Sequence, residues 1–95
     1  MKRKKIEYPT YEQLLKLTSA ETVVENSLCE LRFVPAGKDY EGHIAIELKD
    51  AFATRCWVER KLFDNTIDGY KQAIEACEKH VDEQLSIIER KYYEE

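Results

Sequence analysis

The stretch DNTIDGYKQAIEACEKHVDEQLSIIERKY, residues 64–92, decides the fold of this chain. Its apolar residues recur at intervals of three and four, and at about 100° per residue they fall within an arc of roughly 80°. The stretch opens with three residue types that favour a helix N-terminus, and no proline follows. We predict one amphipathic helix from about residue 65 to about residue 92. Its core face consists of Ile67, Tyr70, Ile74, Cys77, Val81, Leu85, Ile88 and Tyr92.

The length of this helix exceeds what the rest of the chain can cover. About 28 residues span roughly 42 Å, whereas strands of about 6–8 residues cover only ~20–27 Å. The far end of the helix is therefore short of partners within one copy, and symmetric pairing is the commonest way to hide such a surface. We predict a homo-oligomer, with a dimer favoured, whose interface consists of Leu85, Ile87, Ile88, Tyr92 and Tyr93.

A second, weaker apolar stripe lies on the same helix, roughly 100° from the main face. It consists of Ala73, Ala76, His80 and Ile87. Two interpretations stay open. The stripe is a contact for another helix, or its alanines are there as good helix formers that need no partner.

The middle of the chain alternates with a period of two, which is typical of half-buried strands. Two strands separated by a turn at residues 35–39 are predicted on this basis, with apolar faces formed by Cys29, Leu31 and Phe33 and by Ile44, Ile46 and Leu48. A third strand is predicted over residues 52–63, with Cys56 and Val58 on one face and Trp57, Glu59 and Lys61 on the other. Three antiparallel strands with one solvated face fit this alternation.

The N-terminal third is less regular. The run Thr10-Tyr11-Glu12-Gln13 matches a capping box and predicts a short helix over residues 10–18. Residues 19–26 fit a further helical start at Thr18 or a strand through Thr22-Val23-Val24 that ends in a turn at Asn26-Ser27, and we favour helix or loop. The prediction is a flexible basic tail over residues 1–9 and a single α+β domain over residues 10–95, in which a short helix, a three-stranded antiparallel β-meander and the long helix pack together.

Composition limits the class of protein. A chain of 95 residues is long enough for one domain, and 43% apolar residues indicate a folded chain. No apolar run approaches the ~18–20 residues of a membrane span, and no apolar stretch follows the basic start, as a signal peptide requires. Three cysteines, an odd number, favour reduced thiols. We therefore expect a cytoplasmic protein.

No arrangement of residues predicts catalysis or a cofactor. Cys77 and His80 stand one helical turn apart, and with Cys29 and Cys56 they reach a Cys3His zinc set. The set lacks the two closely spaced pairs of most structural zinc sites, and free cysteines more often act as small core residues. There is no Ser/His/Asp set and no phosphate-binding glycine loop. We expect a non-catalytic protein without a metal.

The favoured function is a small interaction protein that self-associates through its last helix and binds another macromolecule. Aromatic residues and arginine dominate interface hot spots, so the predicted partner-binding residues are Trp57, Arg55, Tyr40 and His43. Phage and mobile-element accessory proteins that inhibit host defence systems are of this size and composition, which is an analogy only.

Two other functions are alternatives. A nucleic-acid-binding or regulatory module would use the Trp57 strand and the basic residues Lys2, Arg3, Lys4, Lys5, Arg60 and Lys61. The net charge of −4 weighs against nucleic acid as the main partner. A small-ligand binder would hold a nucleotide in a pocket between subunits, where His43, Arg55 or Trp57 from two copies converge.

Overall fold

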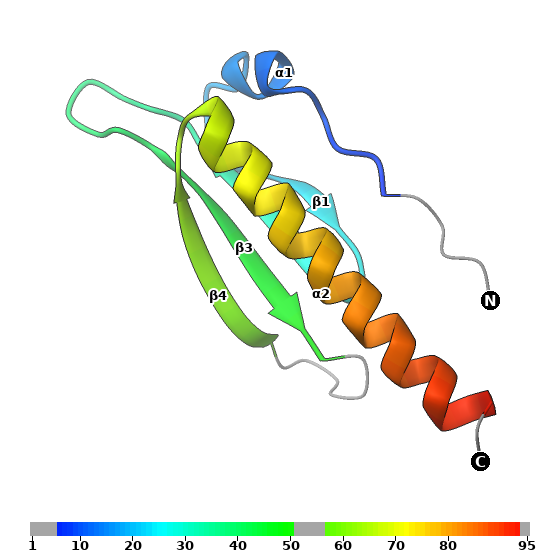
Figure 1. Cartoon of the computed structure of the whole chain (residues 1–95). Coiled ribbons are helices and arrows are strands. Elements are labelled where there is room, and N and C mark those ends of the chain that lie inside the picture. The colour runs from blue at the N-terminus through cyan, green and yellow to red at the C-terminus, as the bar shows by residue number, and fades with distance from the viewer. Residues whose placement is uncertain (1–5, 51–56, 94–95) are drawn as a thin grey trace.

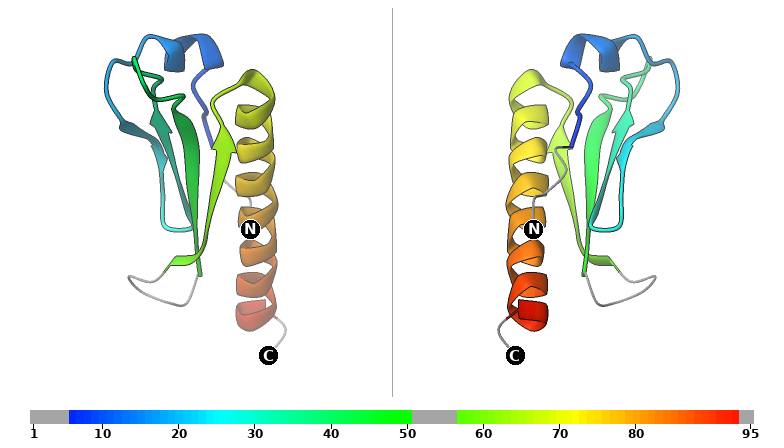
Figure 2. Two further views of the ribbon diagram at one scale, coloured as in Figure 1. Left: turned by 90° about the vertical axis from the view of Figure 1, so that its left-hand side faces the viewer. Right: turned by 90° about the vertical axis from the view of Figure 1, so that its right-hand side faces the viewer.

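The computed structural model describes residues 6–50 and 57–93, with backbone only for residues 57, 58 and 91–93. Its elements are α1 (Tyr11–Leu15), β1 (Glu21–Glu25), β2 (Cys29–Val34), β3 (His43–Lys49), β4 (Trp57–Asp64) and α2 (Ile67–Tyr93). The strands form one antiparallel sheet in the order β1-β2-β3-β4, and α2 lies across one of its faces (Figures 1 and 2). The predicted α+β class is confirmed, with four strands in the sheet where we predicted three.

The strand that the sequence analysis did not favour is β1, so helix or loop over residues 19–26 was wrong. Its antiparallel register with β2 shifts between Thr22 and Val24. The bulge adds one residue, Val23, to this strand. The extra residue interrupts the period of two that marks a strand in the sequence. The alternative turn at Asn26 is present, because the Asn26 Oδ1 atom accepts the backbone N–H groups of Leu28 and Cys29 at 2.8 and 2.9 Å.

The two central strands follow the prediction. Leu31 lies opposite Ile46, and Phe33 lies opposite Ile44, and all four side chains are buried against α2. The connection between these strands requires Gly42, whose φ is 78°. A Cβ atom there would stand 2.5 Å from the Val34 carbonyl oxygen.

The register of β4 places Glu59 and Lys61 on the same face of the sheet, as predicted. Lys61 lies opposite Ile46, and Glu59 lies opposite Leu48, and directly paired residues share a face of the sheet. Both charged residues therefore lie on the side that carries α2. The register shifts by one residue between Leu48 and Lys49, and β4 is an edge strand, where long charged side chains reach solvent. Cys56 and the side chains of Trp57 and Val58 lie outside the described residues.

The buried side of α2 differs from the predicted face. Tyr70, Cys77 and Val81 are buried as predicted, but Ile67 is 55% exposed. Ala73 and His80, which belong to the second stripe, are buried against the chain's own sheet. The His80 Nε2–H donates to the Lys49 carbonyl oxygen at 2.7 Å. These two residues are therefore not a contact for a second helix.

The first described residues pack on the rest of the domain. Ile6 and Tyr8 contact the core, and the Tyr70 hydroxyl donates to the Pro9 carbonyl oxygen at 2.6 Å. Packed structure therefore begins before residue 10, and residues 1–5 of the predicted tail lie outside the described residues. The capping box is confirmed, since Thr10 Oγ1 accepts the Gln13 N–H at 3.1 Å and Gln13 Oε1 accepts the Thr10 N–H at 2.8 Å. The helix ends at Leu15, three residues early.

Tyr70 leads to a prediction for alkaline solution. Burial, and then the nearby Cys77 thiol, raise the pKa of Tyr70 to about 12 from an ordinary value of about 10. Because the folded pKa lies above the unfolded one, the stabilisation is complete below pH 10 and is lost as the pH rises toward 12. Unfolding free energy is therefore expected to fall across this range. Urea titrations at a series of pH values measure it.

The control for this prediction is Tyr70→Phe. At pH 7 the variant is expected to lose about 1 kcal/mol with the hydrogen bond to Pro9. Above pH 10 it loses less than the wild type, because one group with a raised pKa is gone. Some alkaline loss remains, since burial and then the Glu78 carboxylate also raise the pKa of Tyr8. Parallel profiles for the two proteins would contradict this assignment.

Candidate interaction surface

The last turns of α2 extend past the ends of the strands (Figures 1 and 2). The helix has 27 residues, or about 40 Å. Leu85 and Ile88 are only half-buried there, and Ile87 is 44% exposed. At ~100° per residue Leu85 and Ile87 point about 200° apart, so one sheet cannot cover both. Of the other predicted interface residues, Tyr92 and Tyr93 belong to α2, and their side chains lie outside the described residues.

An apolar groove of about 520 Å³ runs beside the C-terminal half of α2. Three segments far apart in the sequence build it: the first described residues, the β1–β2 hairpin and α2. Its apolar walls are Ile6, Val23, Val24, Leu28, Val81 and Leu85. One side of the distal helix therefore faces the groove and the other faces solvent.

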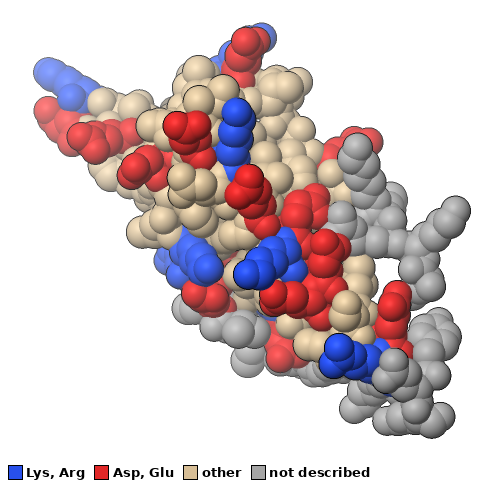
Figure 3. Space-filling model, viewed as in Figure 1, with Lys and Arg blue, Asp and Glu red and all other residues tan. Residues whose placement is uncertain are grey.

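The border of the groove is acidic. Glu7 and Glu25 line it directly. On α2, Asp82 lies three residues before Leu85 and Glu89 lies four residues after it, spacings that place side chains on the same side of a helix. In the space-filling view, several acidic side chains lie around the C-terminal half of α2, with Lys and Arg side chains among them (Figure 3). The groove thus combines an apolar floor with a negative rim.

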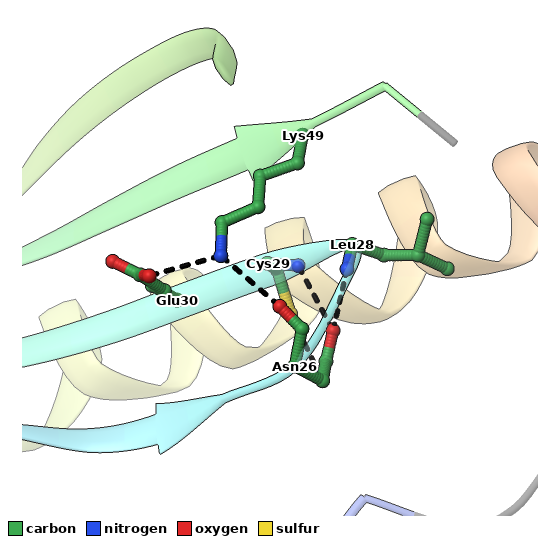
Figure 4. A network of polar contacts seen from close by, with 5 residues as sticks. All are labelled: Asn26, Leu28, Cys29, Glu30 and Lys49. Atoms are coloured by element: carbon green, nitrogen blue, oxygen red, sulfur yellow. Dashed lines mark hydrogen bonds and ion pairs between the residues drawn. The ribbon is translucent and has the colours of Figure 1, made fainter. Parts of the chain in front are cut away.

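A polar network fixes the hairpin end of the groove (Figure 4). The Lys49 ammonium group donates to the Asn26 carbonyl oxygen at 3.1 Å and forms an ion pair with the Glu30 carboxylate at 2.9 Å. The Lys49 backbone N–H donates to the Leu28 carbonyl oxygen at 2.8 Å. The turn that lines the groove is therefore tied to β3, and the groove is preformed.

The predicted partner-binding residues do not form one patch within a copy. Tyr40 and His43 lie together in the β2–β3 connection, where the tyrosine hydroxyl and the histidine Nδ1 form a hydrogen bond. Trp57 pairs with Lys49, at the other end of β3 from His43. Six residues of strand separate these positions by about 20 Å. Arg55 lies outside the described residues.

Among the basic residues proposed for nucleic-acid binding, the two on β4 lie beside acidic residues. Arg60 lies opposite Glu47 on β3, and the Lys61 ammonium group is 3.7 Å from the Glu59 carboxylate. Each therefore has an acidic neighbour on the sheet, which is typical of a solvated strand surface. Lys2, Arg3, Lys4 and Lys5 lie outside the described residues.

Cys29 and Cys77 meet in the core between β2 and α2, where both are buried. Cys77 forms a side-chain hydrogen bond with Cys29, and Asn26 Nδ2 donates to the Cys29 sulfur at 3.6 Å. The hydrogen bond between the thiols, followed by burial, raises the pKa of Cys77 well above its usual range. His80 is bonded to Lys49 instead of to either thiol.

Residues 6–50 and 57–93 contain no group of three or more His, Cys, Asp or Glu side chains placed to hold a metal ion. Cys56, the remaining thiol of the Cys3His set, lies outside them. Within the same residues, no helix has the length and hydropathy needed to cross a membrane.

The sequence analysis missed the groove. Its walls come from short segments, and only the pair of valines in β1 carries a local signal, their β-branched side chains. No protein-family model matches this chain, and comparison with curated proteins and with solved structures finds no similar one.

Proposed function

We propose that this protein is a non-catalytic interaction protein that forms a homodimer through the distal part of α2 and binds another macromolecule. The observation that carries the proposal is the exposure of Ile87 on a helix that extends past its own sheet. The dimer contact consists of Leu85, Ile87 and Ile88 together with Tyr92 and Tyr93.

The chemistry of the distal helix supports this proposal. Burial of exposed apolar side chains drives association, and a second copy supplies an identical segment that needs the same cover. The two core cysteines are unpaired thiols, which supports the cytoplasm as the compartment.

The identity of the bound macromolecule is a separate proposal. The proposal that this protein comes from a phage or a mobile element, and that it binds and inhibits a host defence system, rests on size and composition alone.

The substitution Ile87→Glu tests the dimer. A charge without a partner in an apolar contact is costly, so the variant is expected to have the monomer mass at concentrations where the wild type is dimeric. Because Ile87 is 44% exposed in one copy, the fold of the variant should be retained. Light scattering after size exclusion measures the mass, and circular dichroism checks the fold.

Ile67→Glu is the matched control. It places the same change on the same helix at a position that is 55% exposed, in the first turn, where a negative charge is favourable. This variant is expected to stay dimeric. The proposed interface would be wrong if both variants kept the wild-type mass, or if Ile67→Glu dissociated the dimer as effectively as Ile87→Glu.

A further inference from the structure

We infer that the groove beside α2 binds a segment of a partner protein in which apolar side chains stand next to lysine or arginine. This inference rests on the proposed function and deepens it, because it assigns the second macromolecule a surface and a chemistry. The dimer contact uses the far end of the helix, and the groove lies between that helix and the β1–β2 hairpin. Leu85 belongs to both surfaces.

The apolar half of the inference comes from the walls. A volume of about 520 Å³ lies within the ~300–1,000 Å³ of typical ligand pockets. The walls carry branched aliphatic side chains from three segments, and burial of such surface is what drives association. Asn26 and Ser27 line one end, where the Lys49 contacts fix the turn. A preformed groove also reduces the ordering cost of binding.

The basic half comes from charge. Glu7 and Glu25 line the groove, and Asp82 and Glu89 flank Leu85 on the helix. The whole chain carries 15 Lys and Arg against 19 Asp and Glu, a net charge of −4. Negative rims attract positive segments and repel carboxylates and phosphates. A nucleic acid is therefore disfavoured here.

A second copy fits the groove less well than a basic segment does. Its most apolar exposed part is the distal helix, which carries Asp82, Glu83 and Glu89 beside Arg90 and Lys91. That segment lacks the positive excess that the rim favours. The partner is accordingly a different protein.

The probe is a synthetic 12-residue peptide with a central Leu-Ile-Leu flanked by Lys-Arg pairs. Its control has glutamate at every basic position. Calorimetry at low salt is expected to show binding of the basic peptide only. Glu25→Lys is expected to weaken that binding about tenfold, since like charges across a contact oppose association. Glu21→Lys, the same change at an exposed position on the same strand outside the groove, should leave it unchanged.

Other outcomes would overturn the inference. These are no binding of the basic peptide up to millimolar concentration, equal binding of the acidic peptide, or equal losses in the Glu25→Lys and Glu21→Lys variants. Peptide binding that converts a dimer to monomers would assign the groove to a second copy. The mass of the protein is measured in the same samples, so peptide binding by a chain that is always monomeric would reject the dimer and retain the groove.

Discussion

The substitution Phe33→Ala is expected to lower the unfolding free energy by about 3–5 kcal/mol. Phe33 is 1% exposed, is among the largest fully buried side chains, and lies opposite Ile44 under α2. Truncation removes apolar burial and leaves a cavity that the surrounding sheet can fill only in part. The total free energy of unfolding of a native protein is about 5–15 kcal/mol, so the variant loses a large share of its stability.

Urea unfolding followed by circular dichroism measures this loss as a lower midpoint. The control is Leu62→Ala, because Leu62 is 63% exposed, and an exposed truncation changes stability by only about 0.5 kcal/mol. Equal midpoints for the two variants would show that the core does not lie between β2, β3 and α2.

The second large effect reverses the usual rule for glycine in helices. Gly69 lies in the first turn of α2, where replacement by alanine normally stabilises a helix by about 1 kcal/mol. Here a Cβ atom would stand 2.1 Å from the Asp64 carbonyl oxygen. A backbone atom cannot move aside without disturbing the β4–α2 turn, which Thr66 holds by accepting the Gly69 N–H at 2.9 Å. Gly69→Ala is therefore expected to destabilise the protein by about 2 kcal/mol.

Gly37→Ala is the control for this substitution, since nothing lies within 4 Å of a Cβ atom at Gly37. Its thermal midpoint is expected to stay within a few degrees of the wild type, while that of Gly69→Ala falls by about 8–16 °C. An unchanged or raised midpoint for Gly69→Ala would mean that the turn is looser than the structure shows.

The sequence determined α2, β2 and β3 because each signal there is local. The helix has capping residues, an uninterrupted apolar period and no proline, and the two central strands alternate cleanly. The first strand was missed because the extra residue of its bulge, Val23, interrupts the alternation of buried and exposed positions. The one-residue register shift between Leu48 and Lys49 was not predicted, because it is set by strand pairing, which no single segment encodes.

Only one part of the candidate interaction surface, the distal end of α2, was predictable, because it depends on the length of the helix relative to the strands. The distal helix followed from comparing about 42 Å of helix with ~20–27 Å of strand. The groove was not predictable, because Ile6, Val24 and Leu85 meet only after the sheet has formed. The interpretation of the second stripe as a contact for another helix was wrong for a related reason. Periodicity identifies an apolar arc on a helix, but the position of the sheet decides which part of that arc is buried.

The most direct test is the mass of the wild-type chain in solution across a dilution series. Sedimentation equilibrium from low to high micromolar concentration should give twice the chain mass of 11.2 kDa at the upper end. Dilution should shift the distribution toward monomer. A mass of 11.2 kDa at every concentration would contradict the claim that the exposed end of α2 is covered by a second copy.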